Sequence, residues 1–179
     1  MRQFLKTILA NIGLSVFRVK VTYSAQARAA IASGKCVIHA NHVSLLDGVI
    51  VALASPAPLV FAVDTDFSRR SRIARFGLSA LSKAGFGAVV PLDASAPFGM
   101  RALKRVLAQG GNVMVFPEGR ISPNGSRQTD MPGLNWLARS TGADLVEVVI
   151  SGAEESKLFA RAGSKLWPKI TLRFGEFSA

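Results

Sequence analysis

A histidine and an aspartate, His42 and Asp47, follow an apolar segment and stand five residues apart. On a continuous helix this spacing would place them about 140° apart, because 3.6 residues complete one turn. In a tight turn between a strand and a helix, the Asp47 carboxylate can instead hold one imidazole nitrogen while the other faces a substrate. A histidine oriented in this way acts as a general base. The alternative, which the spacing alone favours, is that Asp47 caps the following helix and His42 is an ordinary loop residue.

A second polar loop follows the apolar run NVMVF and reads PEGRIS, with Glu118, Gly119 and Arg120 at its start. Gly119 permits backbone angles that let the chain approach an anion closely. The planar guanidinium of Arg120 suits phosphate oxygens, and Glu118 would fix Arg120 or contact a substrate hydroxyl. The alternative is a solvated turn that contains a local ion pair.

The rest of the chain predicts a scaffold that brings these two loops together. Short runs rich in Val and Ile alternate with helical patterns, which is typical of an α/β fold with a mostly parallel or mixed sheet flanked by helices. In such sheets, ligand chemistry gathers beyond the carboxyl ends of the strands. The predicted strands are residues 20–23, 36–40, 59–63, 88–92, 112–116, 145–150 and 170–174, and the helices with capping signals are 69–83, 98–109 and 132–142.

The N-terminal segment reads as an amphipathic helix, since it has no long uninterrupted apolar core and no small-residue cleavage site. Apolar residues at three- and four-residue steps form one stripe beside Arg2, Lys6 and Asn11. The stripe either lies in a lipid interface or packs on the core of the domain, which is the commoner use. The chain is therefore divided into a helix, 1–17, and a domain, 18–179. The stripe consists of Phe4, Leu5, Ile8, Leu9, Ile12 and Val16.

The charge balance points to an anionic partner. The 179 residues contain 22 Lys and Arg against 11 Asp and Glu, which gives a formal charge of +11. Nucleic acid, an acidic membrane surface and phosphate-bearing substrates all fit this excess. The arginine-rich run 68–75 is either a solvated helix face or a docking patch for anionic head groups or an acidic carrier protein.

Other candidate residues carry weaker signals. Cys36 is the single cysteine, which excludes an intramolecular disulfide and indicates a reducing compartment. Together with His39 and His42 it has a regular spacing, but Cys36 and His39 would point to opposite faces of a strand, so no metal site is expected. Trp136 and Trp167 are interpreted as partly buried core, with a lipid interface as the alternative.

The two loops together resemble a known family. The stretch NHVSLLD matches the NHx4D signature of the glycerophospholipid acyltransferases, and FPEGRIS resembles their FPEGTRS block. The resemblance is closest to the acyltransferase half of the bifunctional acylglycerophosphoethanolamine acyltransferase and acyl-carrier-protein synthetases, through NHVSLLDG, FAVDTD, VPLD and FPEGRIS. It extends from about Val19 to Phe174.

This resemblance implies an α/β fold approached by a membrane-associating N-terminal helix, at the cytoplasmic face of a membrane, as a peripheral or monotopic protein. It implies acyl transfer from an acyl-carrier-protein or coenzyme A thioester to the free hydroxyl of a lysophospholipid, without a nucleophilic Ser or Cys, a cofactor or a metal. His42 would deprotonate the hydroxyl and Asp47 would orient His42. The acceptor-binding residues would be Glu118, Gly119 and Arg120, supported by Asn41 and Ser44.

Three departures from the common family pattern bear on the acceptor. Asp93 in VVPLD stands where many relatives have a phosphate-binding arginine, and a carboxylate repels a phosphate monoester. This favours an acceptor like lysophosphatidylethanolamine over lysophosphatidate or glycerol 3-phosphate, and the early position of Arg120 agrees with the same branch. In the last block, Glu147 and Val149 replace a proline and a basic residue, and the resemblance does not explain them.

The alternative of another class is a non-enzymatic basic module that binds nucleic acid or anionic lipid. Only the net charge and the arginine-rich run support it. The chain has only one Tyr and two Trp, and no pattern of exposed aromatic residues interleaved with basic ones is evident for stacking on bases. We therefore expect no nucleic-acid partner.

Overall fold

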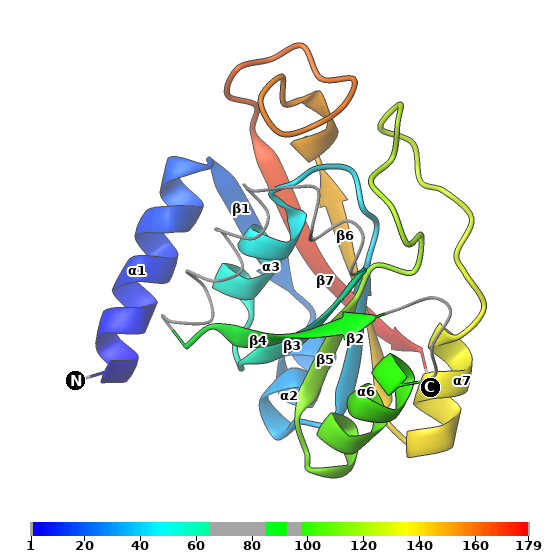
Figure 1. Ribbon diagram of the computed structural model, residues 1–179. Coiled ribbons are helices and arrows are strands. Elements are labelled where there is room, and N and C mark those ends of the chain that lie inside the picture. Colours follow the sequence, from blue (N-terminus) through cyan, green and yellow to red (C-terminus); the bar gives the residue numbers. More distant parts are fainter. Residues whose placement is uncertain (1, 65–84, 93–97, 179) are drawn as a thin grey trace.

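The computed structural model describes residues 2–64, 85–92 and 98–178, and a single seven-stranded sheet forms its centre (Figure 1). The strand order is β1-β7-β6-β2-β5-β3-β4. All seven predicted strands are present, with ends that differ by a few residues. Their bounds are β1 Val19–Tyr23, β2 Cys36–Ala40, β3 Leu59–Asp64, β4 Gly87–Leu92, β5 Asn112–Val115, β6 Asp144–Ser151 and β7 Ile170–Ser178.

The strand directions place the two polar loops side by side. The strands β6, β2, β5, β3 and β4 are paired in parallel, whereas β7 is antiparallel to β6 and parallel to β1. The sheet is therefore mixed. Because β2 and β5 are parallel neighbours, the segments that follow them leave the sheet at the same edge, as expected for a ligand site.

Helices cover both faces of this sheet because side chains of a strand alternate between its faces. Cys36 and Ile38 of β2 belong to a core that also contains α2 (Ala25–Ser33) and α3 (Asp47–Ala54). Val37 belongs to a second core with α6 (Phe98–Ala108) and α7 (Leu134–Thr141). The predicted helices near 98–109 and 132–142 are thus present. The predicted helix 69–83 with its arginine run, and Asp93, lie outside the described residues.

The helix α1 (Arg2–Val16) lies along one side of the molecule (Figure 1). The side chains of its apolar stripe are exposed. Packing of this stripe on the core is therefore wrong. The other side of the helix faces the domain: Ala10 is buried, and a Cβ atom at Gly13 would meet the Leu53 side chain at 2.8 Å. The stripe residues, 38 to 71% exposed, are Phe4, Leu5, Ile8, Leu9, Ile12 and Val16.

Candidate active site

His42 and Asp47 form a pair at the carboxyl end of β2. The His42 Nδ1 atom lies 3.0 Å from Oδ2 of Asp47, and the side chain of His42 is 14% exposed whereas that of Asp47 is fully buried. A carboxylate only accepts hydrogen bonds, so this contact places the proton on Nδ1. The Nε2 atom then carries the free lone pair and is the imidazole nitrogen able to take a proton.

The chain holds Asp47 in place with four hydrogen bonds to its carboxylate. Oδ2 accepts the backbone N–H groups of Val43 and Ser44, at 2.6 and 2.8 Å, in addition to the His42 ring, and Oδ1 accepts the Ser44 hydroxyl at 2.6 Å. Asp47 is the first residue of α3, yet its side chain folds back onto the preceding loop and caps no helical amide. The helix-cap interpretation is therefore wrong, and Ser44 supports the aspartate directly.

The His42 ring is held from its face as well as from its edge. It stacks on the ring of Phe116, with centroids 4.1 Å apart and planes at 17°. Phe116 follows β5, so the aromatic contact joins the two loops. No role was predicted for Phe116 from the sequence, although it is the first residue of the FPEGRIS block.

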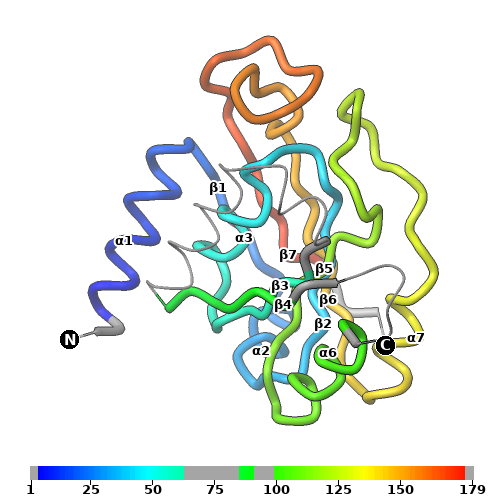
Figure 2. Tube along the Cα trace, in the orientation of Figure 1, coloured from blue at the N-terminus to red at the C-terminus, as the bar shows by residue number. Residues whose placement is uncertain are grey.

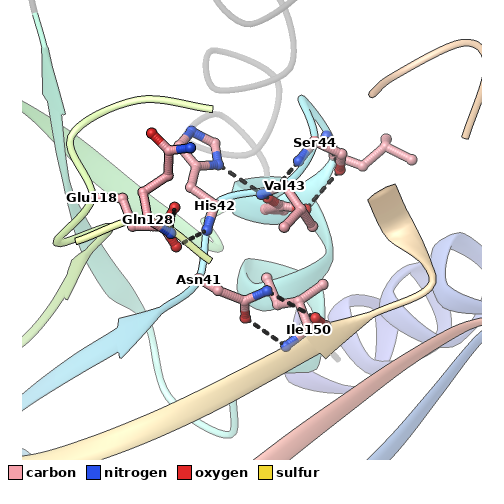
Figure 3. A network of polar contacts seen from close by, with 9 residues as sticks. Asn41, His42, Val43, Ser44, Glu118, Gln128 and Ile150 are labelled. Carbon is pink, nitrogen blue, oxygen red and sulfur yellow. Dashed lines mark hydrogen bonds and ion pairs between the residues drawn. The ribbon is translucent and has the colours of Figure 1, made fainter. Parts of the chain in front are cut away.

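Glu118 connects the two loops through backbone amides. Its side chain is buried, with Oε1 accepting the N–H of His42 at 3.1 Å and Oε2 accepting the N–H of Gln128 at 3.0 Å (Figure 3). A further backbone bond, from the Ser122 N–H to the His42 carbonyl at 2.8 Å, joins the same loops. The expected pairing of Glu118 with Arg120 is therefore wrong. Its carboxylate instead binds the backbone N–H groups of His42 and Gln128.

Arg120 lies on the surface beside this junction. Its Nε–H donates to Oε1 of Gln128 at 3.0 Å, and the side chain is exposed. Gly119 adopts a φ of +67°, a conformation that favours glycine, and lies under the side chain of Met131. Gln128 thus holds Arg120 with its side chain and Glu118 with its backbone. It stands outside the motif, and sequence reasoning missed it because no local pattern marks it.

Asn41, the first residue after β2, is bonded to the backbone of β6. Its Nδ2 donates to the Ile150 carbonyl at 2.9 Å, and its Oδ1 accepts the Ile150 N–H at 2.8 Å (Figure 3). The two hydrogen bonds extend the pairing of β2 with β6, with the Asn41 side chain in place of a strand backbone. They fix the point at which the chain after β2 leaves the sheet. Asn41 and Ser44 are thus structural supports of the His42 loop.

Glu147, the unexplained departure in β6, takes part in an ion-pair network. Its Oε1 accepts a hydrogen bond from Arg127 at 2.8 Å, and Arg127 also lies 3.3 Å from Asp130. Glu147 neighbours His39 in the parallel pairing of β2 and β6. The network therefore ties the loop after β5 to the sheet, which accounts for an acidic residue at this position.

Cys36, on β2, is neither a nucleophile nor part of a metal site in the described structure. Cys36 lies in the core, where burial and, secondarily, the Asp144 carboxylate raise the pKa of its thiol to about 11. At neutral pH this thiol stays protonated and is a poor nucleophile. Within residues 2–64, 85–92 and 98–178, no three His, Cys, Asp or Glu side chains are grouped so as to hold a metal ion.

The burial of His39 leads us to expect a loss of stability at acidic pH. Burial lowers its pKa below the ordinary 6.5; the nearby Glu147 and Asp130 raise it and Arg127 lowers it, without reversing the direction. Its Nδ1 is buried without a hydrogen-bond partner. Below pH 6.5 the unfolded chain binds this proton before the folded one does, so the free energy of unfolding falls as pH decreases. We expect the free energy of unfolding of His39→Gln, measured with urea from pH 7.5 to pH 5, to decrease less than that of the wild type. An equal decrease in the two proteins would contradict the assignment of this pH dependence to His39.

Two comparisons place the chain among known proteins. A sequence model of the family described as Acyltransferase matches residues 18–151. The fold is similar to that in the crystal structure of the 1-acyl-sn-glycerophosphate (LPA) acyltransferase, PlsC, from Thermotoga maritima, with a TM-score of 0.66 and 20% sequence identity. The similarity covers 99% of this chain and 70% of the Thermotoga chain. The His42 and Glu118 loops both lie within the matched family region, and the chain belongs to the acyltransferase family.

Proposed function

We propose that this enzyme transfers a fatty acyl group from a thioester to the free hydroxyl of a lysophospholipid, with His42 as the general base. The observation that carries the proposal is the 3.0 Å contact between His42 Nδ1 and the buried Asp47 carboxylate, which leaves Nε2 available. The acyl donor is acyl carrier protein or coenzyme A in thioester linkage. Membership of the acyltransferase family supports this reaction class.

The proposed reaction needs one base and one electrophile. Nε2 of His42 takes the proton of the acceptor hydroxyl while the hydroxyl oxygen forms a bond to the thioester carbon. The resulting tetrahedral oxyanion collapses, the carbon–sulfur bond breaks, and the thiolate leaves with the proton from His42. Asp47 stabilises the transient imidazolium and keeps Nδ1 protonated throughout. The step balances without an acyl-enzyme, so it requires no nucleophilic side chain.

The phosphate of the acceptor is assigned to Arg120. Its guanidinium is exposed beside the His42 loop and retains donors beyond the one that binds Gln128. Gly119 belongs to the same proposed subsite as the residue before Arg120, in a turn that its positive φ allows and that the bond from its N–H to the Phe116 carbonyl, at 3.0 Å, closes. Glu118 supports this subsite by fixing the positions of the two loops, through its bonds to the His42 and Gln128 N–H groups.

We infer that the preferred acceptor resembles lysophosphatidylethanolamine, as in the acyltransferase half of the bifunctional enzymes. The inference depends on the sequence block with Asp93, because a carboxylate disfavours a phosphate monoester. A second candidate is 1-acylglycerol 3-phosphate, which the name of the Thermotoga protein favours. The two acceptors differ in the charge and substitution of the phosphate, so a direct comparison separates them.

We also propose that the protein works at the cytoplasmic face of a membrane as a peripheral or monotopic protein. The exposed stripe of α1 is the observation in favour, together with the absence of Asp and Glu from the first 46 residues. Over the described part of the chain, no helix is both long and apolar enough to cross a bilayer.

Arg120→Ala is expected to raise KM for the lysophospholipid by roughly 10-fold or more, because a charge-assisted hydrogen bond contributes about 1.5–3 kcal/mol. KM for the thioester donor should stay the same. Initial rates at varied concentrations of each substrate measure both values. Arg139→Ala, which changes an exposed arginine in the last turn of α7, is the matched control. An equal rise in both KM values would contradict a specific contact with the acceptor.

The substrate assignment is tested with wild-type protein in detergent micelles. Acyl-carrier-protein and coenzyme A thioesters are each offered with lysophosphatidylethanolamine or lysophosphatidate, and the lipid product is identified by mass spectrometry. We expect transfer to both acceptors to be detectable and the ethanolamine lipid to be preferred in kcat/KM. A preference for lysophosphatidate would overturn the inference from Asp93, and the absence of any product would overturn the proposed function.

A further inference from the structure

The segment between β6 and β7 presents large apolar side chains at the surface. Leu158, Leu166 and Trp167 are 51, 63 and 45% exposed, and we call these three residues the loop patch. The tube in Figure 2 shows this segment projecting beyond the end of the sheet. Its backbone is braced internally, with the Lys157 N–H on the Lys165 carbonyl at 2.8 Å and the Lys165 N–H on the Glu155 carbonyl at 2.9 Å. The exposed residues are thus held on an ordered support.

Trp167 joins the loop patch to the exposed stripe of α1. Its Nε1–H donates to the Val16 carbonyl at 2.7 Å, and its ring stacks on Phe17 with centroids 6.4 Å apart. Arg18 closes the junction by donating to the Trp167 carbonyl at 3.0 Å. Since Val16 is the last residue of the stripe, the two apolar surfaces meet at Trp167. The prediction that Trp167 belongs to the core is therefore wrong, and Trp136, 54% exposed, is not a core residue either.

The charges around the loop patch identify its partner as an anionic surface. Residues 156–169 contain four basic residues and no acidic residue. All four basic side chains are exposed, and one of them, Lys165, pairs with Glu155. Basic residues that surround Trp and Leu are typical of the interface of an anionic bilayer. A nucleic acid would require stacking aromatics, whereas two of the three patch residues are aliphatic. The basic residues are Lys157, Arg161, Lys165 and Lys169.

The segment between β6 and β7 also contacts the His42 loop. The Leu45 N–H donates to the Phe159 carbonyl at 2.9 Å. Leu46, which precedes Asp47, shares a shallow apolar depression with Phe159 and Trp167. Any surface that binds the loop patch therefore lies next to the loop that carries His42.

We propose that Leu158, Leu166 and Trp167 insert into the surface of an anionic bilayer and form a second lipid contact beside α1. The proposal rests on the proposed function in one respect, the attachment of α1 to a membrane. Two contacts joined at Trp167 fix the rotation of the protein about α1, which a single helix would leave free. In that orientation the His42 loop is held at the bilayer surface, where a lysophospholipid resides.

The two tryptophans of the chain provide the test, because they lie on different sides of the molecule. Trp167 lies against α1, whereas Trp136 is on α7 beneath Lys104 of α6, at the other face of the sheet. Trp136→Phe leaves Trp167 as the single tryptophan. On vesicles of phosphatidylglycerol and phosphatidylcholine, we expect its emission to shift to shorter wavelength and to be quenched by brominated acyl chains. Trp167→Phe leaves Trp136 as the matched control, which should show neither change.

Leu158→Ser with Leu166→Ser provides the affinity measurement. Removing two apolar side chains from the interface should weaken vesicle binding by about 10-fold or more, whereas Trp136→Ala should not weaken it. Quenching of Trp136 rather than Trp167 would overturn the proposal, as would unchanged binding of the double variant. Concentration-dependent dimers that the double variant abolishes would also overturn it, by assigning the patch to a second copy of the chain. The vesicle measurements are repeated with His42→Ala, because membrane binding should not require acyl transfer. Normal binding by this variant therefore separates a failure of the proposed membrane contact from a failure of the proposed activity.

Discussion

His42→Ala is expected to lower kcat for acyl transfer by about 10³-fold, within the range of 10²–10⁴ that a general base contributes. The variant loses Nε2, the atom to which the proposed mechanism moves the proton, and keeps the backbone N–H that Glu118 binds. KM for the lysophospholipid should change little, because the acceptor phosphate is assigned to Arg120. Release of free thiol from an acyl thioester, followed at saturating acceptor, measures the loss.

His39→Gln is the matched control for this loss. His39 lies on β2, three residues before His42, and its side chain is near Glu147 and the ion-pair network instead of Asp47. The control should retain most of the wild-type rate. A His42→Ala rate within about tenfold of wild type, in a protein with unchanged thermal unfolding, would contradict the assignment of His42 as the base.

Asp47→Asn is expected to lower kcat by about 10²–10⁴-fold, because an amide no longer enforces the Nδ1-protonated tautomer of His42. It should also lower the free energy of unfolding by about 1–3 kcal/mol, since an amide NH₂ cannot accept the hydrogen bonds that the buried carboxylate accepts. Four donors converge on this side chain, from His42, Val43 and twice from Ser44. Steady-state rates and urea unfolding of the same preparation measure the two effects.

Ser44→Ala separates the two effects of Asp47. It removes the hydroxyl that donates to Oδ1 and leaves the His42 contact to Oδ2 in place. We expect about 1 kcal/mol of lost stability and a much smaller loss of activity than in Asp47→Asn. Equal losses of activity in the two variants would contradict an orienting role for Asp47 and assign it a purely structural one.

The strands were predictable because β-rich runs in this chain are short and bounded by turn residues. The run CVIHA is β2 to the residue, and the other strands differ from the prediction only at their ends. The parallel pairing of β2 and β5 follows from the α/β pattern, and with it the convergence of the two loops. The reversal of β7 and β1 did not follow, because strand direction depends on where the chain crosses the sheet rather than on local composition.

The contacts within the site were less predictable than its location. The sequence showed that Asp47 was able to fold back, but only the four donors distinguish this arrangement from a helix cap. Glu118 was expected to face Arg120 or a substrate; two backbone amides instead occupy its oxygens, and backbone donors leave no trace in composition. The exposure of the apolar stripe of α1 was not predicted either. The helix packs on the domain through its small residues Ala10 and Gly13, which allow a close approach.

In the proposed mechanism the acyl group passes directly from the thioester to the acceptor, with His42 and Asp47 as the catalytic pair. The most direct measurement incubates the wild-type protein with an acyl thioester alone, records its intact mass, and then adds lysophosphatidylethanolamine. We expect an unmodified protein in the first stage and diacyl lipid only in the second, with no lipid product from His42→Ala. A protein mass increased by one acyl group, or a lipid product formed equally well by His42→Ala, would contradict this mechanism.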